Sequence, residues 1–146
     1  MIRQIVTDTT QLAIPSTKIE EIEVIRPVIE DLIDTAEHHR TTKIGCIGLA
    51  ANQIGWLKRA IVVWQGNGWV VMINPEWAPR DGKEGSSHEG CLSRPSVSVK
   101  VKRHKRIECR WLDTDGDERS AKFSHLDARV IQHEVDHLSG IFISSK

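Results

Sequence analysis

The sequence lacks the features that mark membrane and secreted proteins. Its 146 residues contain no apolar run long enough to cross a bilayer, and the stretch MIRQIVTDTT at the N-terminus has no apolar core of the kind that a secretory signal needs. Cysteine is scarce, and an odd number of three widely spread residues argues against a disulfide scaffold. These absences predict a cytoplasmic protein that does not associate with membranes.

Charge of one sign is not in excess either. Twenty Lys and Arg balance twenty Asp and Glu, so the net charge is zero when the histidines are neutral. This balance excludes a strong overall attraction to nucleic acid, and it leaves room only for a local basic patch. The length is that of one domain, and no internal repeat or low-complexity segment is present. We therefore expect a single domain over residues 1–146 and no specific nucleic-acid partner.

Hydrophobic periodicity predicts a helix, a β-rich middle and a second helix. Apolar residues at helical spacing favour a helix over residues 26–39, with Pro27 in its first turn and a loop at 38–43 after it. Residues 1–20 and 77–88 have the composition of irregular segments. Strands are expected at 59–64 and 69–73, joined by a tight turn at Asn67-Gly68, and then from Ser96 onward, at 107–112 and at 119–123.

The clearest element is a helix near the C-terminus. Ser124 can cap it, with Asp127 as the capping-box partner, and Gly140 marks its end. One face of this helix carries Leu126, Val130, His133, Glu134 and His137. With the strands before it, the helix predicts an α+β fold in which antiparallel or mixed β-sheets wrap a central helix.

Residues 133–137 of this helix read HEVDH. Because residues four apart share one helical face, His133 and His137 can chelate one metal ion, while Glu134 can take a proton from metal-bound water. The alternative is a chance pair of histidines on an amphipathic helix, but packing alone rarely places a Glu between two such histidines. The motif therefore predicts a metal centre without specifying one reaction.

A catalytic metal site needs a third protein ligand and an open position. Cys91 is a candidate because it lies in EGCLS at residues 89–93, although a lone cysteine is more often a buried apolar residue. Cys109 alternates along a predicted strand, so we expect it to pack in the core. Small residues crowd the segment 46–55, where Gln53 can offer an amide N–H to an oxyanion; taken alone, this segment fits a tightly packed turn equally well.

Together, these segments resemble the three signature motifs of the peptide deformylase family, in the family's order. They stand here as CIGLAANQ at 46–53, EGCLS at 89–93 and HEVDH at 133–137, and INPE at 73–76 is similar to a further family segment. The resemblance spans almost the whole chain. It implies a single catalytic domain that removes the formyl group from the N-terminal formyl-methionine of new polypeptides and releases formate. Among members, the chain resembles short forms without a C-terminal tail, such as those encoded by phages.

The resemblance also implies a role for each site residue. The metal ligands would be Cys91, His133 and His137, and the ion would be Fe²⁺, with Zn²⁺, Ni²⁺ or Co²⁺ able to replace it. Glu134 would be the general base, and Gln53 with the backbone N–H of Leu92 would stabilise the oxyanion. Asp136 and Arg103 would pair behind the ligands. The residues that would contact the peptide or its methionine side chain are Ile47, Gly48, Gly90, Leu126, Arg129 and Val130, together with His133.

The same resemblance implies partners and a setting. The substrates would be N-formyl-methionyl peptides of nascent chains, met in the cytoplasm of a bacterium or of a phage-infected host. Transient contact with a ribosome is compatible with this, but we expect no C-terminal docking helix, and we expect a monomer. Two positions depart from the family pattern: Cys46 stands for the first glycine of its motif, and Ser98 stands where many members carry an arginine.

Two other functions fit parts of the sequence. A small HExxH metalloprotease would need a His or Glu as the third metal ligand, whereas the matching segment offers Cys91. An RNA-binding protein would use the basic run at 100–106, but alternation with valine indicates the solvated face of a strand.

Overall fold

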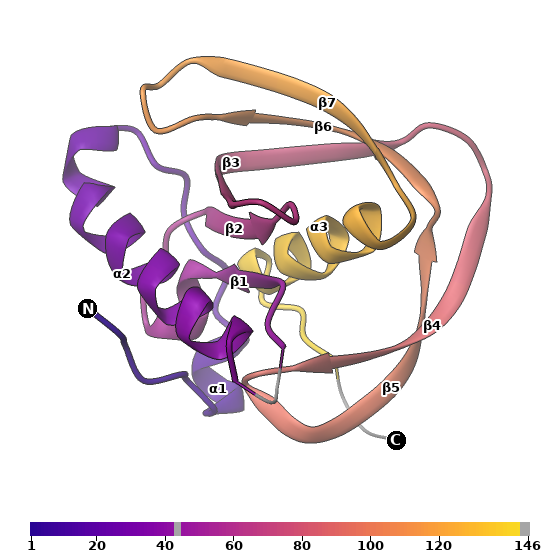
Figure 1. Cartoon of the computed structure of the whole chain (residues 1–146), viewed down its shortest axis with the longest axis horizontal. Helices are drawn as coiled ribbons and strands as arrows, with labels where there is room; N and C mark the ends of the chain where they lie inside the picture. The colour runs from indigo at the N-terminus through magenta and orange to yellow at the C-terminus, as the bar shows by residue number, and fades with distance from the viewer. Residues whose placement is uncertain (43–44, 144–146) are drawn as a thin grey trace.

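Two antiparallel sheets and three helices make up the computed structural model, which describes residues 1–42 and 45–143 (Figure 1). The larger sheet has the strand order β1-β2-β3-β6-β7, and β4 pairs with β5 in a separate two-stranded sheet. The helices are α1 (Thr9–Leu12), α2 (Ile22–Arg40) and α3 (His125–Leu138), with a 3-10 turn η1 at Ala51–Ile54. The strands are β1 (Gly48–Ala50), β2 (Ala60–Trp64), β3 (Trp69–Pro79), β4 (Glu84–Cys91), β5 (Arg94–His104), β6 (Arg106–Leu112) and β7 (Glu118–Ser124).

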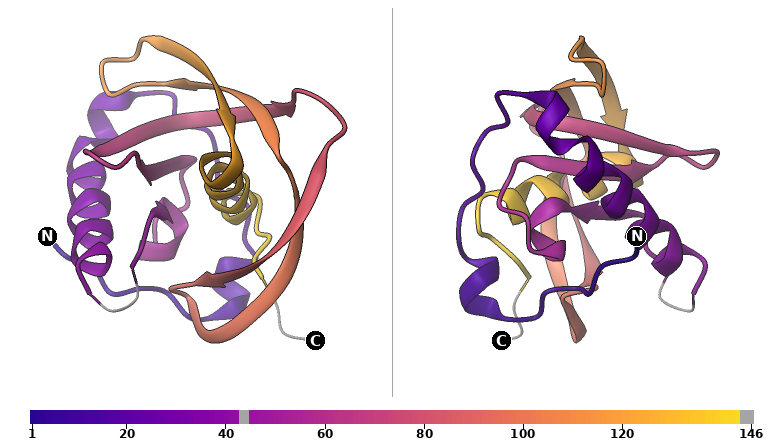
Figure 2. Two further views of the ribbon diagram at one scale, coloured as in Figure 1. Left: turned by 45° about the vertical axis from the view of Figure 1, so that its right-hand side comes forward. Right: turned by 90° about the vertical axis from the view of Figure 1, so that its left-hand side faces the viewer.

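Helix α3 lies in the middle of the molecule, and strands surround it on several sides (Figures 1 and 2). Its apolar residues Ala128 and Ile131 pack in one hydrophobic cluster with Ile61 and Val63 of β2. The predicted α+β fold with a central helix is therefore confirmed.

Helix α2 covers the opposite face of the larger sheet. Ile29 and Leu32 pack in a second cluster with Val62, which alternates along β2 with the residues that face α3. Strand β2 is thus buried on both faces, and this explains its continuous apolar run.

Helix α2 begins earlier and ends later than predicted. It starts at Ile22, so Pro27 lies inside the helix and not in its first turn. The expected loop at 38–43 is wrong for residues 38–40, which are helical, and Lys43 lies outside the described residues. The expectation of an irregular first segment also missed α1, a single turn whose Thr10 N–H donates to the side chain of Asp8.

The predicted loop at 77–88 is wrong. Strand β3 continues to Pro79 and β4 starts at Glu84, so only residues 80–83 turn. The strands at 59–64, 69–73, 96 onward, 107–112 and 119–123 are confirmed, although in the first hairpin the positive φ falls on Gly66 and not on Asn67. Among the described residues, no helix is long and apolar enough to span a membrane.

The ends of α3 follow the sequence only in part. Ser124 is the N-cap residue, but its side chain makes no capping hydrogen bond, so the predicted capping box with Asp127 is wrong. At the other end, Gly140 takes a φ of +78°, and its N–H donates to the carbonyl of His137. The predicted stop at this glycine is confirmed.

Gly140→Ala should destabilise the fold. The new side chain would strain a positive φ and would collide with the carbonyl of Ala13, so we expect a loss of about 2–4 kcal/mol in the free energy of unfolding. Urea unfolding measures the loss. Gly66→Ala is the matched control, because Gly66 has a φ of +89° with nothing within 4 Å of an added Cβ. Equal losses in the two variants would show that contact with Ala13 contributes nothing.

Candidate active site

A cleft of about 370 Å³ lies between the segment before β1, the end of β4 and the start of α3. Its size is within the range typical of small-ligand sites. Gln53, Cys91, His133 and Glu134 line it together. Every residue that was expected to contact the peptide also lies in its wall: Ile47, Gly48, Gly90, Leu126, Arg129 and Val130.

The side chains of Cys91, His133 and His137 converge beside this cleft, with Cys91 and His133 in its wall and His137 buried next to them. The Nε2 atoms of His133 and His137 are 3.2 Å apart, and Cys91 Sγ lies 3.3 Å from His137 Nε2. A tetrahedral ion with Zn–S and Zn–N bonds of ordinary length holds such donors about 3.3–3.6 Å apart. Burial lowers the pKa of His137 to about 3, whereas for His133 the effect of burial is outweighed by Cys91, Glu89 and Glu134, which raise its pKa to about 10. The donor set therefore fits a single metal ion.

The two histidines and the cysteine come from different parts of the chain. His133 and His137 are one turn apart on the buried face of α3, as their spacing predicted. Cys91 is the last residue of β4, just beyond a break in the β4–β5 register. The site therefore depends on how the β4–β5 hairpin is placed against α3.

Glu134 lies beside the ligands and is buried. Its Oε1 has no hydrogen-bond partner among the described residues, and burial raises its pKa to about 7. A carboxyl group with such a pKa can both accept and return a proton near neutral pH.

Gly48 brings the backbone of β1 against this carboxyl group. A Cβ at Gly48 would lie 2.8 Å from Glu134 Oε2 and 2.7 Å from a methyl carbon of Val130. No side chain therefore fits at Gly48 while Glu134 keeps its position.

Gln53 is held by its own segment. Its Oε1 accepts the Ala50 N–H at 3.0 Å, and its Nε2 lies 3.3 Å from Cys91 Sγ and 3.2 Å from Ser93 Oγ. The residue is 2% exposed, and its amide N–H group faces Cys91. Leu92, half-buried next to Cys91, also lines the cleft.

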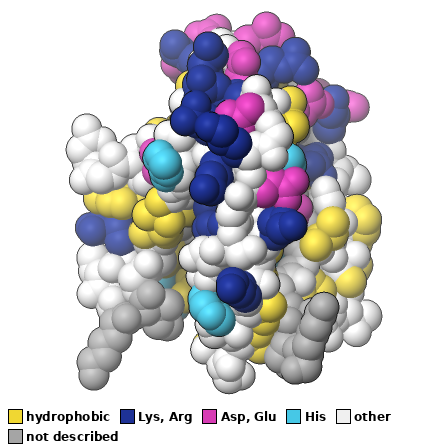
Figure 3. All heavy atoms as spheres, turned by 90° about the vertical axis from the view of Figure 1, so that its right-hand side faces the viewer, with side chains coloured by type: hydrophobic (Ala, Val, Ile, Leu, Met, Phe, Trp, Pro, Cys, Tyr) yellow, Lys and Arg dark blue, Asp and Glu magenta, His cyan; other side chains and the backbone are white. Residues whose placement is uncertain are grey.

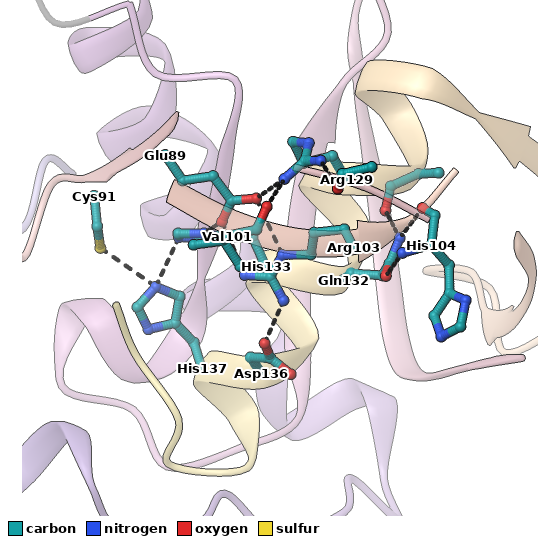
Figure 4. A network of polar contacts seen from close by, with 12 residues as sticks. Glu89, Cys91, Val101, Arg103, His104, Arg129, Gln132, His133, Asp136 and His137 are labelled. Atoms are coloured by element: carbon teal, nitrogen blue, oxygen red, sulfur yellow. Dashed lines mark hydrogen bonds and ion pairs between the residues drawn. The ribbon is translucent and has the colours of Figure 1, made fainter. Parts of the chain in front are cut away.

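A carboxylate network lies behind His133 (Figure 4). His133 Nδ1 is 2.8 Å from Glu89 Oε1, and Glu89 also accepts from Arg103 and Arg129. Burial acts to raise the pKa of Glu89, but the hydrogen bonds from these three partners hold it well below its usual range. A charged Glu89 fixes the ring orientation of His133 and leaves its Nε2 available to a metal.

The comparisons with known proteins agree with this geometry. A model of the polypeptide deformylase family matches residues 2–146.

The chain belongs to this family.

A peptide deformylase of Thermoanaerobacter pseudethanolicus is 44% identical over 100 residues, which are 68% of this chain but only 62% of that protein. The chain thus spans less than two thirds of the length of that relative. A Thermotoga maritima peptide deformylase structure aligns with a TM-score of 0.89 and 33% identity, covering 97% of this chain and 95% of the other. A Synechococcus elongatus peptide deformylase in complex with actinonin aligns with a TM-score of 0.86 and 31% identity, covering 97% and 75%.

Membership of the deformylase family confirms the resemblance seen in the three motifs. The structure brings the segments at 46–53, 89–93 and 133–137 to one cleft, although 79 residues (54–132) lie between the first and the last. It also places Arg103 in an ion pair with Asp136. Cys109 is fully buried in the core, as predicted.

The two departures from the family pattern differ in their surroundings. Cys46 lines the cleft, where its Sγ donates to the carbonyl of Gly48 at 3.2 Å, and burial raises the pKa of this thiol to about 12. It is therefore a protonated wall residue at neutral pH. Ser98 is exposed on β5 and is not part of the cleft wall.

Sequence reasoning missed three residues that support the site. Glu89 was quoted only as part of a motif, Ser93 was given no role as the partner of Gln53, and Gln132 was not singled out. Glu89 is the first residue of the EGCLS segment, which marked it as a residue near the site. Only the fold shows that its carboxylate contacts His133. Gln132 adjoins the HExxH motif, and no pattern in the sequence marks its partner.

Proposed function

We propose that this chain hydrolyses the formyl group from N-formyl-methionyl peptides and releases formate. The observation that carries this proposal is the convergence of Cys91 Sγ and two His Nε2 atoms beside the unpartnered carboxyl group of Glu134. Removing a formyl group is amide hydrolysis, which needs an activated water, a stabilised oxyanion and a protonated leaving amine.

We assign the metal site to Cys91, His133 and His137, with Fe²⁺ as the physiological ion and Zn²⁺, Ni²⁺ or Co²⁺ as possible replacements. When bound, such an ion lowers the pKa of water and so supplies a nucleophile near neutral pH. A thiolate ligand donates more charge than a carboxylate and suits this group of softer ions. Glu89 and the Arg103–Asp136 pair support the ligands from behind.

Glu134 would take a proton from the attacking water and pass it to the leaving amine. Its buried, unpartnered Oε1 in the cleft supports this role. The Gln53 amide and the Leu92 backbone N–H would donate to the oxyanion, and Gln53 is held ready by Ala50 and Ser93.

The cleft can accept an extended peptide. Strand β1 pairs only with β2 among the described residues. The Ile47 carbonyl accepts the Trp64 N–H on that side, so the other edge offers the backbone of Gly48, whose carbonyl would exchange the Cys46 thiol for a substrate strand. Gly90 lies opposite, at the end of β4. The methionine side chain would pack on Leu126, Val130 and the aliphatic stem of Arg129. We propose that a formyl carbon, which bears only hydrogen, fits the narrow floor where larger acyl groups do not.

Appearance of the free amino terminus, with formate measured alongside for the formyl peptide, tests the proposal. With the metal-loaded chain under anaerobic conditions, we expect turnover of a formyl-methionyl tripeptide and no detectable turnover of the matched acetyl-methionyl tripeptide. The same protein should leave internal peptide bonds intact, which separates a deformylase from a small HExxH protease. Equal hydrolysis of both acylated peptides, or cleavage of internal bonds, would contradict the proposal.

We further propose that the chain acts as a monomer in the cytoplasm of a bacterium or of an infected host. Nascent formylated chains would be its partners, with transient ribosome contact at most. Sedimentation of the purified protein tests the oligomeric state.

A further inference from the structure

The β4–β5 hairpin (residues 84–104) carries one of the three converging donors, yet little apolar packing attaches it to the molecule. It forms a sheet of its own, with no strand of the larger sheet paired to it among the described residues. Of its residues, only Leu92 packs against either hydrophobic cluster. Lys100 and Lys102 of the hairpin are exposed, and Figure 3 shows Lys and Arg side chains among small polar residues on this side of the molecule. Its position on α3 must therefore come from other contacts.

Polar side chains on one face of α3 supply these contacts. Arg129, Gln132, His133 and Asp136 are spaced three and four residues apart, so they point to the same side of the helix. Each of them bonds to the hairpin (Figure 4). Asp136 pairs with Arg103, and His133 reaches Glu89.

Arg129 spans both strands of the hairpin. Its Nη2 donates to the Gly85 carbonyl of β4 at 2.8 Å, and its Nη1 donates to the Val101 carbonyl of β5 at 3.0 Å and to Glu89 at 2.7 Å. The guanidinium group thus bonds to the hairpin through both of its Nη atoms. Arg129 also lines the cleft. A planar guanidinium suits such a bridge because its donors are fixed in direction.

Gln132 holds the base of the hairpin. Its Nε2 donates to the His104 carbonyl at 2.8 Å, and its Oε1 accepts the His104 N–H at 3.0 Å. Both backbone groups of His104 are therefore paired with one side chain of α3. Gln132 does not line the cleft, so it cannot act on a substrate directly.

We propose that Arg129 and Gln132 are positioning residues that dock the β4–β5 hairpin on α3 and thereby set the place of Cys91 relative to His133 and His137. This inference rests on the metal site of the proposed function. In this inference, the charged group of Arg129 fixes the geometry of the site and does not bind the methionine side chain.

Cobalt binding tests the inference without relying on turnover. The variants are Arg129→Met, which keeps the stem but loses the donors; Arg129→Lys, which reaches one acceptor at most; and Gln132→Met. The control is Arg110→Met, which removes another arginine–carboxylate pair, to Glu76, neither of which lines the cleft. Measurements are the Co²⁺ dissociation constant by chelator competition, the visible spectrum of the bound Co²⁺, and the melting temperature.

We expect Arg129→Met and Gln132→Met each to weaken Co²⁺ binding by about 10–100-fold and to alter the cobalt spectrum, with Arg129→Lys intermediate. Arg110→Met should match the parent protein in both Co²⁺ affinity and cobalt spectrum. If the melting temperature falls while affinity and spectrum stay at parental values, the two residues are structural only and the inference is wrong. Should Arg129→Met fail to fold, Arg129→Lys and Gln132→Met decide the question by the same criteria.

The cobalt-binding test of Arg129 and Gln132 and the activity test of the proposed function can fail independently of each other. A parent protein that binds Co²⁺ but releases no formate would refute the deformylase proposal and leave the docking inference to its own test. A parent protein that binds no Co²⁺ would refute both.

Discussion

Glu134→Ala should lower kcat for formyl-methionyl peptides by about 10²–10⁴-fold, the usual contribution of a general base. The carboxyl group lies in the cleft with a free Oε1, and it is not one of the three converging donors. The metal content should therefore stay at the parental value. Formate release and metal analysis on the same sample measure both quantities.

Glu134→Gln provides the control for shape. It keeps the volume of the buried side chain but cannot take a proton, so kcat should fall as in the alanine variant. Because a buried carboxyl group without a partner costs free energy, the melting temperature should not fall in the glutamine variant. Loss of the metal ion in either variant would show that Glu134 is a ligand and would refute its assignment as the base.

Cys91→Ala should weaken metal binding by more than about 100-fold, because losing a residue that only orients a ligand already costs about 10–100-fold. Cys91 Sγ is one of three donors, and the two imidazoles that remain leave an incomplete site. Metal analysis after dialysis against a weak chelator measures the loss.

Cys46→Ala and Cys109→Ala are matched controls for this variant. Both thiols are free and buried, and neither belongs to the converging group. Burial raises the pKa of each to about 12, so neither offers a thiolate at neutral pH. Unchanged metal content in Cys91→Ala, or an equal loss in Cys46→Ala, would overturn the ligand assignment.

The pairing of the two histidines was predictable from the sequence because it depends on residue types at short spacing. His133 and His137 share a helical face in any α-helix, so the pair could be inferred before the fold was known. Glu89 could not be assigned in the same way. Its contact with His133 spans 44 residues and exists only because the hairpin lies across α3.

The errors in the fold also have physical reasons. Strand β4 reads EGSSHEGC and buries little apolar surface, so it lacks the alternation that marks a strand packed on a core. It is held by pairing with β5 and by polar contacts to α3, and neither leaves a hydrophobic pattern. Helix α2 extends before Pro27 because the missing N–H removes a single hydrogen bond, which packing of Ile25 and Ile29 can offset.

Within the described part of the chain, the edge of β1 that is not paired with β2 faces the cleft, and residues 90–92 at the turn between β4 and β5 also line it. An extended substrate lying between them would act as a temporary extra strand that links two otherwise separate sheets. The backbone pairing between substrate and β1 would then form when the substrate binds and dissociate when the product leaves. If the chain acts on peptides as proposed, release of the deformylated product would be faster with short strand pairing, and a longer β1 edge would retain the product and slow turnover.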